Sequence, residues 1–325
     1  MFELILETED AKQYFLKVLP TRQLSHSYIF EGPYGIGKKT FAMELVKTLL
    51  CSTEGTEPCN ACNSCHMLKH ESHPDLITIK KDKKTTKIDD VRAAINELNT
   101  KPYQSSYKIL IVQEAHTLTQ EAQNALLKTI EEPPSYAIII LVCENIEKLL
   151  PTIKSRCINI RFHPLSAQVI SNFLSYKDVS LLEQQIIGKL CEGSMGLAND
   201  LLDNEDLLDI RKMSIDNILT LQSTEDIMTV YNMVTQITEL KEDITSYLNF
   251  WLFWYRDIIC IKGNEVNDLY FADYLNELKE MAEKLSFRQI GNHLDYLKQA
   301  IPDVLSNVNN TFIIEQLLLN IRNCS

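Results

Sequence analysis

Four cysteines lie close together near the start of the sequence and could bind one metal ion. They are Cys51, Cys59, Cys62 and Cys65, separated by seven, two and two residues. Two consecutive C-x-x-C turns would place three thiolates around one point, and four thiolates satisfy a tetrahedral Zn²⁺ ion without leaving an open position. The spacing therefore predicts a structural zinc site, which would stabilise a short segment with little apolar content of its own.

Three other chemistries use cysteines at similar spacings. Cys62-Asn63-Ser64-Cys65-His66 matches the pattern for attachment of c-type haem, but that interpretation leaves Cys51 and Cys59 without a role. A redox C-x-x-C pair usually follows a strand in a thioredoxin-like context, which this segment lacks. An iron–sulfur cluster would find suitable ligands here but no accompanying redox module. The sequence favours zinc and leaves these three as alternatives.

A glycine-rich segment upstream of the cysteines could bind phosphate. Gly32, Gly35, Gly37 and Lys38 fit the pattern G-x-x-x-x-G-K, between a strand-like run and a helical run. Glycines allow backbone N–H groups to face phosphate oxygens, while the lysine and the helix N-terminus add positive charge. Residues 32–39 therefore resemble a phosphate loop, and a glycine-rich turn without a ligand is the alternative.

Two positions that normally hold Mg²⁺ beside a bound nucleotide carry unsuitable residues. Lys39 stands where a phosphate loop has Ser or Thr, and Thr40 is one residue late, about 100° further around the helix. Gln113 stands at the end of a strand-like run, where a carboxylate is usual. Its neutral amide is a weaker ligand for Mg²⁺ than a carboxylate. Glu114, the usual water-activating base, is retained. The sequence leaves ATP binding open and predicts that ATP is not hydrolysed.

Strands and helices alternate through the first half of the chain and would position these residues. Strand-like runs lie at residues 28–30, 75–80, 108–112, 137–143 and 158–162, and helical patterns lie at residues 40–50, 89–98 and 120–130. This alternation predicts an α/β fold with a parallel sheet covered on both faces. Beyond residue 163 the strand pattern ends, and helical patterns continue to the end of the sequence.

Composition limits the classes of function that remain. The 325 residues suffice for two or three domains, with 45% hydrophobic and 23% charged residues. A formal net charge of −12 argues against a protein that coats DNA unaided, because phosphate contacts need an excess of lysine and arginine. The N-terminal sequence has no basic stretch followed by an apolar core, and a cytoplasmic location is expected.

Several segments, in this order and with similar spacing, resemble the bacterial clamp-loader subunits of the AAA+ family. They are HSYIFEGPYGIGKKT with the four-cysteine insertion after it, QNALLKTIEEPP and LLPTIKSRC, and NVNNTFIIEQLLLNIR is a weaker match near the end. The first three cover roughly residues 20–165. The resemblance implies a RecA-like AAA+ domain over residues 1–163 with a zinc module at about 51–65, a helical lid domain over residues 164–207, and an all-helical collar or oligomerisation domain over residues 208–325.

The resemblance also assigns a role to Ser155-Arg156-Cys157. In the family, the arginine of this motif acts as an arginine finger in trans, reaching the ATP site of a neighbouring subunit. A guanidinium there stabilises charge that develops on the transferred phosphoryl group. From the residues alone, Arg156 would pass for a surface arginine paired with a carboxylate.

Departures from the family's motor subunits indicate the type of member. Besides Lys39 and Gln113, Cys143-Glu144 replaces a pair of threonines that sense the γ-phosphate, and Gly196 replaces a sensing arginine. These losses resemble the delta-prime-type members, which implies a stator without intrinsic ATPase activity. The implied partners are gamma/tau-type motor subunits and a delta subunit, and, through the complex, the beta clamp and primer–template DNA of the DNA polymerase III holoenzyme. An active motor ATPase and a stand-alone zinc-containing nucleotide or DNA sensor are the alternatives.

Overall fold

The chain forms two compact units, Met1–Leu201 and Leu202–Ser325. The computed structural model describes residues 9–53, 55–80, 88–177, 179–203, 206–224, 226–265, 269–305 and 309–323. Within these ranges, no helix combines the length and the apolar character needed to cross a lipid bilayer.

The first unit is built on a five-stranded parallel sheet with the strand order β2-β3-β4-β1-β5. Its strands are β1 Ser27–Glu31, β2 Leu76–Ile79, β3 Lys108–Val112, β4 Ala137–Cys143 and β5 Ile158–Arg161. The central strands β3 and β4 are buried along their whole length, and apart from Lys108 at the start of β3 they are apolar, as is usual for strands buried on both faces of a parallel sheet. Each strand-like run predicted from the sequence coincides with one of these strands to within one residue at either end.

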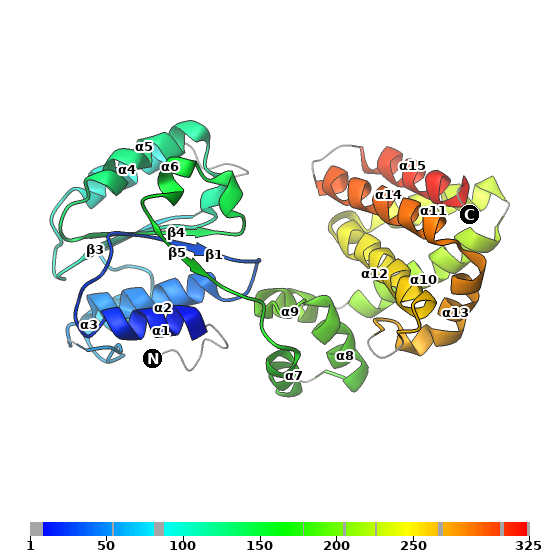
Figure 1. The fold of residues 1–325 in the computed structure, drawn as a ribbon, viewed down its shortest axis with the longest axis horizontal. Coiled ribbons are helices and arrows are strands. Elements are labelled where there is room, and N and C mark those ends of the chain that lie inside the picture. The colour runs from blue at the N-terminus through cyan, green and yellow to red at the C-terminus, as the bar shows by residue number, and fades with distance from the viewer. Residues whose placement is uncertain are drawn as a thin grey trace. The chain divides into compact units, whose positions relative to one another are not determined.

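Helices cover both faces of this sheet (Figure 1). One face carries α1 Glu9–Val18, α2 Lys38–Leu50 and α3 Asn63–Lys69, and the other carries α4 Ile88–Leu98, α5 Gln120–Glu131 and α6 Pro151–Lys154. Two short 3₁₀ helices, η1 Ala115–Thr117 and η2 Ile146–Lys148, follow β3 and β4. The core on the α1–α3 side combines aliphatic side chains with the aromatic rings of Phe15, Tyr28, Phe30, Phe41 and Phe162, whereas the buried core on the other side is aliphatic apart from Cys143. The predicted α/β fold with a covered parallel sheet is confirmed.

Three short helices follow the sheet, and the first compact unit ends within the last turn of the third. They are α7 Ala167–Ser175, α8 Leu181–Leu190 and α9 Met195–Leu202. Ser166 caps α7 through its hydroxyl, and Ser180 and Glu183 form a capping box at the start of α8. The division between a sheet domain and a lid domain at residue 163 stays a prediction.

The second unit is helical in the part that the structure describes. It contains α10 Leu207–Ser223, α11 Ile227–Glu239, η3 Lys241–Asp243, α12 Ile244–Lys262, η4 Ala272–Tyr274, α13 Leu275–Lys284, α14 Phe287–Leu305 and α15 Asn310–Asn323. The core is formed around α12, whose Tyr247, Trp251 and Trp254 are fully buried. The indole of Trp251 donates to the carbonyl oxygen of Ser214 over 2.8 Å, so the ring is fixed against α10. The predicted helical C-terminal region is confirmed.

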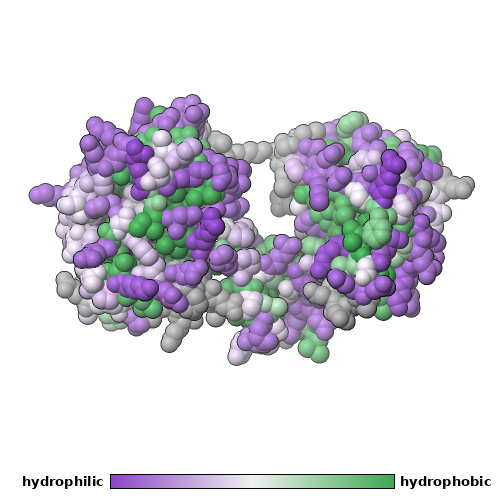
Figure 2. All heavy atoms as spheres, viewed as in Figure 1, coloured by the Kyte–Doolittle hydropathy of each residue, from purple (hydrophilic) through white to green (hydrophobic). Residues whose placement is uncertain are grey.

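Polar residues dominate the visible surface of each unit. On the face drawn in Figure 2, hydrophilic residues cover most of each unit, and hydrophobic residues show between them in smaller areas. Exposed large hydrophobic side chains include Tyr103, Tyr176 and Leu181. Apolar residues at a protein surface are normal and do not by themselves indicate an interface.

Candidate functional site

The glycine-rich segment forms a tight loop between β1 and α2. Gly37 directly precedes α2 and has a φ of 96°, in the left-handed region that disfavours side chains with a Cβ atom. The same loop brings Gly32, Gly35 and Lys38 together. The loop conformation therefore depends on the glycines that the sequence pattern singled out.

The ammonium of Lys38 lies inside this loop. Its Nζ donates to the carbonyl oxygens of Gly32 over 2.6 Å and of Pro33 over 2.5 Å. Burial lowers the pKa of Lys38, and the negative charge of Glu144 opposes that effect. Two loop carbonyl oxygens thus hold the Lys38 ammonium inside the loop that would bind a phosphate group, and the Glu144 carboxylate is close enough to affect its pKa.

A cavity of about 540 Å³ opens beside the loop. Its volume is in the range of small-molecule sites. Four parts of the chain contribute to its wall: the phosphate loop and the start of α2, the segments at the ends of β3 and β4, Leu165 between β5 and α7, and the start of α9. The residues are Tyr34, Gly35, Ile36, Gly37, Lys38, Lys39, Thr40, Gln113, Glu114, His116, Val142, Cys143, Glu144, Leu165, Met195, Gly196 and Asn199.

The formal charges of the side chains that line the cavity sum to zero. Lys38 and Lys39 contribute two positive charges, and Glu114 and Glu144 contribute two negative charges. ATP carries several negative charges, so a site that favours it needs an excess of positive charge or a bound cation. The acidic residue at position 144 therefore weakens the electrostatic attraction for nucleotide.

The two positions expected to hold Mg²⁺ both lie at this cavity. Gln113 directly follows β3, and its backbone N–H extends the sheet by donating to Ile79 over 3.0 Å. Lys39 lies near the Glu71 carboxylate, with Nζ and Oε1 3.9 Å apart. An amide and an ammonium therefore occupy the places of a carboxylate and a hydroxyl. Thr40 lines the cavity as well, and it is the residue at the start of α2 that brings a hydroxyl group to the cavity wall.

The cavity is bounded by a direct contact between the phosphate loop and α9. The backbone N–H of Gly196 donates to the carbonyl oxygen of Gly35 over 2.8 Å. A Cβ atom added at Gly196 would lie 2.6 Å from the Gly35 Cα, and one added at Gly35 would lie 2.3 Å from the Ser194 Oγ. Burial raises the pKa of Tyr34, and so does the negative charge of Asp200 of α9. The resemblance to motor subunits implies that Gly196 stands in place of a sensing arginine, and this contact could not be foreseen from the sequence.

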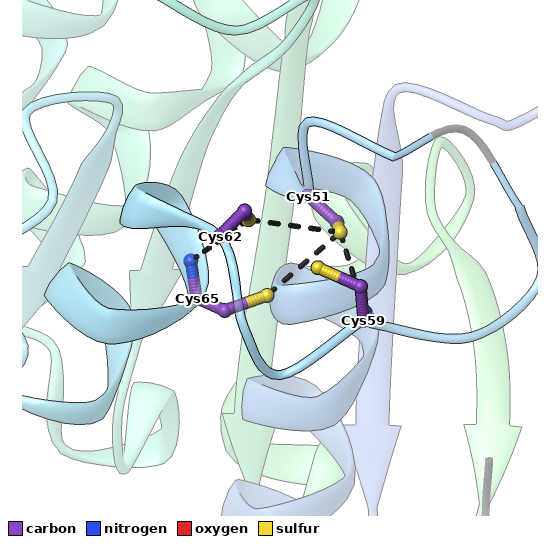
Figure 3. Close-up of side chains that lie close together, drawn as sticks. All are labelled: Cys51, Cys59, Cys62 and Cys65. Atoms are coloured by element: carbon purple, nitrogen blue, oxygen red, sulfur yellow. Dashed lines mark hydrogen bonds between the residues drawn. The ribbon is translucent and has the colours of Figure 1, made fainter.

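The four cysteines converge on one point at the end of α2 (Figure 3). Cys51 directly follows α2, Cys62 directly precedes α3, Cys65 lies within α3, and Cys59 lies in the connection. All four sulfur atoms lie within 4.8 Å of one another. Asn60 adopts a left-handed φ of 56°, which turns the chain between Cys59 and Cys62.

The sulfur geometry fits a tetrahedral metal ion. Cys51 Sγ lies 3.9 Å from Cys62 Sγ and 3.8 Å from Cys65 Sγ. Four sulfurs placed 2.3 Å from a central zinc ion would be about 3.8 Å apart. Backbone N–H groups of Cys59 and Cys65 also point at sulfur atoms of Cys51 and Cys62, both over 3.4 Å. These donors stabilise thiolates, so the cluster could hold a metal ion, and zinc suits a site of four thiolates.

A buried polar network supports the segment that follows the cysteines. Asp75 is fully buried, and its carboxylate accepts backbone N–H groups from Tyr103, Gln104 and Ser105. Burial alone would raise the pKa of Asp75, but these three donors outweigh it and lower the pKa. His73 Nε2 lies 3.2 Å from the Ser64 Oγ of α3. Sequence analysis missed this network because its partners come from separate loops.

The Ser155-Arg156-Cys157 segment lies directly after α6, outside the wall of the cavity. The Nε of Arg156 pairs with the Oε1 of Glu131 over 2.9 Å, and its side chain is 40% exposed. Its Nη1 donates to the Thr152 carbonyl oxygen over 3.1 Å and to the Ser155 Oγ over 3.2 Å. Burial raises the pKa of the Cys157 thiol to about 12, which disfavours the reactive thiolate form.

Comparison with known proteins identifies relatives along most of the chain. The family described as DNA polymerase III, delta subunit, matches residues 7–166, and the family described as DNA polymerase III, delta subunit, C terminal, matches residues 205–323. The chain is 28% identical over 299 residues to the DNA polymerase III subunit delta′ of Bacillus subtilis, with 91% of each protein covered. It is 26% identical over 325 residues to the DNA polymerase III subunit gamma of Buchnera aphidicola, with 91% of this chain and 88% of that protein covered.

A solved structure also resembles the chain at low sequence identity. It is a DNA polymerase III gamma subunit-related protein from Thermotoga maritima, with a TM-score of 0.48 and 17% identity. The match covers 95% of this chain and 98% of that protein.

Proposed function

Because the chain belongs to the family of DNA polymerase III clamp-loader subunits, we propose that it is the delta-prime-type stator of the loader. In this role it assembles with gamma/tau-type motor subunits and a delta subunit. The complex then loads the beta clamp onto primer–template DNA. The chain itself does not hydrolyse ATP.

The observation that carries this proposal is that the cavity beside the phosphate loop lacks both of the usual Mg²⁺ ligands. Lys39 and Gln113 line that cavity, and neither side chain can replace the usual hydroxyl or carboxylate. Phosphoryl transfer depends on a metal ion that bridges the phosphate oxygens, so turnover in this site is not expected. Nucleotide bound here would serve assembly or stability, without a chemical step.

A subunit that does not hydrolyse ATP itself can still assist hydrolysis by a neighbouring subunit, and Arg156 is the residue that would do so. It is exposed and does not line the chain's own cavity, which supports a role at the ATP site of a neighbouring motor subunit. A guanidinium placed there would stabilise the charge of the transferred phosphoryl group. Zinc at the four cysteines would have a structural role, because four thiolates leave no position for substrate.

A functioning motor subunit is the second candidate. Lys38 and Glu114 are retained at the cavity, and the similarity to a gamma subunit extends over 91% of this chain. Both features favour this alternative, which requires Mg²⁺-dependent hydrolysis by the purified chain.

Reconstitution of the loader tests the proposal. Wild-type chain, Arg156→Ala and Arg161→Ala would each be mixed with motor and delta subunits, followed by gel filtration and steady-state ATPase measurement. Arg161 is a matched control, because it is also exposed and pairs with a carboxylate, that of Glu31. We expect all three complexes to form, and turnover at the motor site that meets Arg156 to fall on the order of 10³-fold in Arg156→Ala alone. ATP hydrolysis by the isolated wild-type chain, or full activity of the Arg156→Ala complex, would contradict the proposal.

A further inference from the structure

The guanidinium of Arg156 is held on two of its three nitrogens by the same chain. Nε pairs with the Glu131 carboxylate, and Nη1 bonds to Thr152 and Ser155. Nη2 makes no hydrogen bond to any residue that the structure describes, so its two N–H groups are available to an outside acceptor.

Glu131 is well placed to fix this arginine, because it lies on a rigid element. It is the last residue of α5, whose first turn is capped by the Thr119 hydroxyl. Leu126 and Ile130 anchor α5 in the core between the sheet and the helices. Arg156, in contrast, follows a helix of only four residues, α6, which is attached to the same core through Ile153.

The ion pair itself contributes little stability. The two side chains are 40% and 46% exposed, so solvent screens the attraction between their charges. Its effect on geometry is larger, because an unrestrained arginine side chain has four rotatable bonds. A misplacement of about 1 Å at a reacting group can cost on the order of 10²-fold in rate.

We propose that Glu131 is a positioning residue for Arg156: its carboxylate fixes the guanidinium plane and leaves Nη2 for the γ-phosphate of ATP on the neighbouring subunit. This inference rests on the proposed function of Arg156. It adds a second residue to that function, one that never contacts the nucleotide.

The test compares Glu131→Gln with Glu132→Gln in the reconstituted loader. Glutamine keeps the size of the side chain and removes the charge, and Glu132 is the adjacent exposed acid at the end of α5. We expect Glu131→Gln to lower the kcat of the complex several-fold, with the KM for ATP and the unfolding midpoint of the isolated chain unchanged. Glu132→Gln should match the wild type.

A double variant separates positioning from a general structural role. If Glu131 acts through Arg156, then Glu131→Gln should have no further effect on kcat in the Arg156→Ala background. An additional loss in that background, or full activity of Glu131→Gln beside a strongly impaired Arg156→Ala, would overturn this inference and leave the stator proposal intact. An Arg156→Ala complex with normal activity would instead refute the proposed function.

Discussion

The backbone N–H of Gly196 in α9 donates a hydrogen bond to the carbonyl oxygen of Gly35 in the phosphate loop, over 2.8 Å. This contact explains why the two backbones need glycine at both positions, since a Cβ atom at either would meet an atom of the other segment closer than 3.0 Å. Gly196, where the sequence resemblance implies a sensing arginine in motor subunits, is therefore a packing position in this chain. The contact also fixes α9 against the loop.

Substitution of Gly196 tests this packing. We expect Gly196→Arg to separate α9 from the phosphate loop, to lower the unfolding free energy of the first unit by roughly 1–3 kcal/mol, and to leave the chain without ATPase activity. Denaturant unfolding followed by far-UV circular dichroism provides the measurement. Gly188→Ala in α8 is the control, because its added Cβ would lie 3.6 Å from the nearest Leu174 atom, an ordinary contact. A Gly196→Arg chain as stable as the wild type would show that the contact is dispensable.

The metal ligands at the nucleotide cavity can be restored by Lys39→Thr with Gln113→Asp. For the wild type, we expect the affinity for a fluorescent ATP analogue to change at most about twofold between Mg²⁺ and EDTA, because neither side chain binds the cation. In the double variant, Mg²⁺ should strengthen binding roughly tenfold, or about 1.4 kcal/mol. Adding Lys38→Ala to the double variant should weaken binding in both buffers. A strong Mg²⁺ dependence in the wild type would mean that another group, such as Thr40, holds the ion.

The cysteine cluster should carry about one zinc ion per chain after mild purification, measured by elemental analysis. Cys65→Ser should lose most of this metal and unfold at a lower temperature, since three thiolates and a weak hydroxyl ligand no longer enclose the ion. Cys260→Ser, at a partly buried cysteine of α12, should keep the metal and serves as control. Iron in place of zinc, or equal metal content in both variants, would refute the structural zinc site.

A buried histidine makes the second unit sensitive to acid. His293 in α14 is fully buried with its ring 5.0 Å from that of Tyr255, and burial lowers its pKa from 6.5 to about 4 despite an opposing interaction with Ile321. Between pH 6.5 and 4 the unfolded chain therefore binds a proton that the folded chain does not bind. Stability from this residue is complete above pH 6.5 and is lost as the pH falls toward 4.

The two tryptophans report on this effect, because both lie in α12 of the second unit. Urea unfolding followed by their fluorescence should show that the wild type loses roughly 2 kcal/mol more than His293→Leu between pH 7 and pH 5. His163→Gln, at an exposed histidine of the first unit, should behave like the wild type. If the unfolding free energies of the wild type and His293→Leu change identically with pH, protonation of His293 is not the cause of the acid sensitivity.

Local patterns in the sequence were enough to predict the strands of the sheet and the cysteine cluster, and to indicate that Lys39 and Gln113 are unsuitable ligands for Mg²⁺. Apart from Lys108, the runs at β3 and β4 are continuous and apolar, which is typical of strands buried on both faces of a parallel sheet. The cysteines lie within one short segment, where the chain itself limits the distances between sulfurs. The replacement of metal ligands by Lys39 and Gln113 is a matter of residue type and requires no coordinates.

Contacts between distant segments depended on the tertiary structure. Gly196 meets Gly35 because α9 folds back over the phosphate loop, and Glu131 meets Arg156 because α5 and α6 pack side by side on one face of the sheet. No periodicity or motif spacing encodes such pairs, since they arise from the packing of complete elements. The sequence thus determined which chemical groups this protein has and which it lacks, and the fold decided which of them are held together.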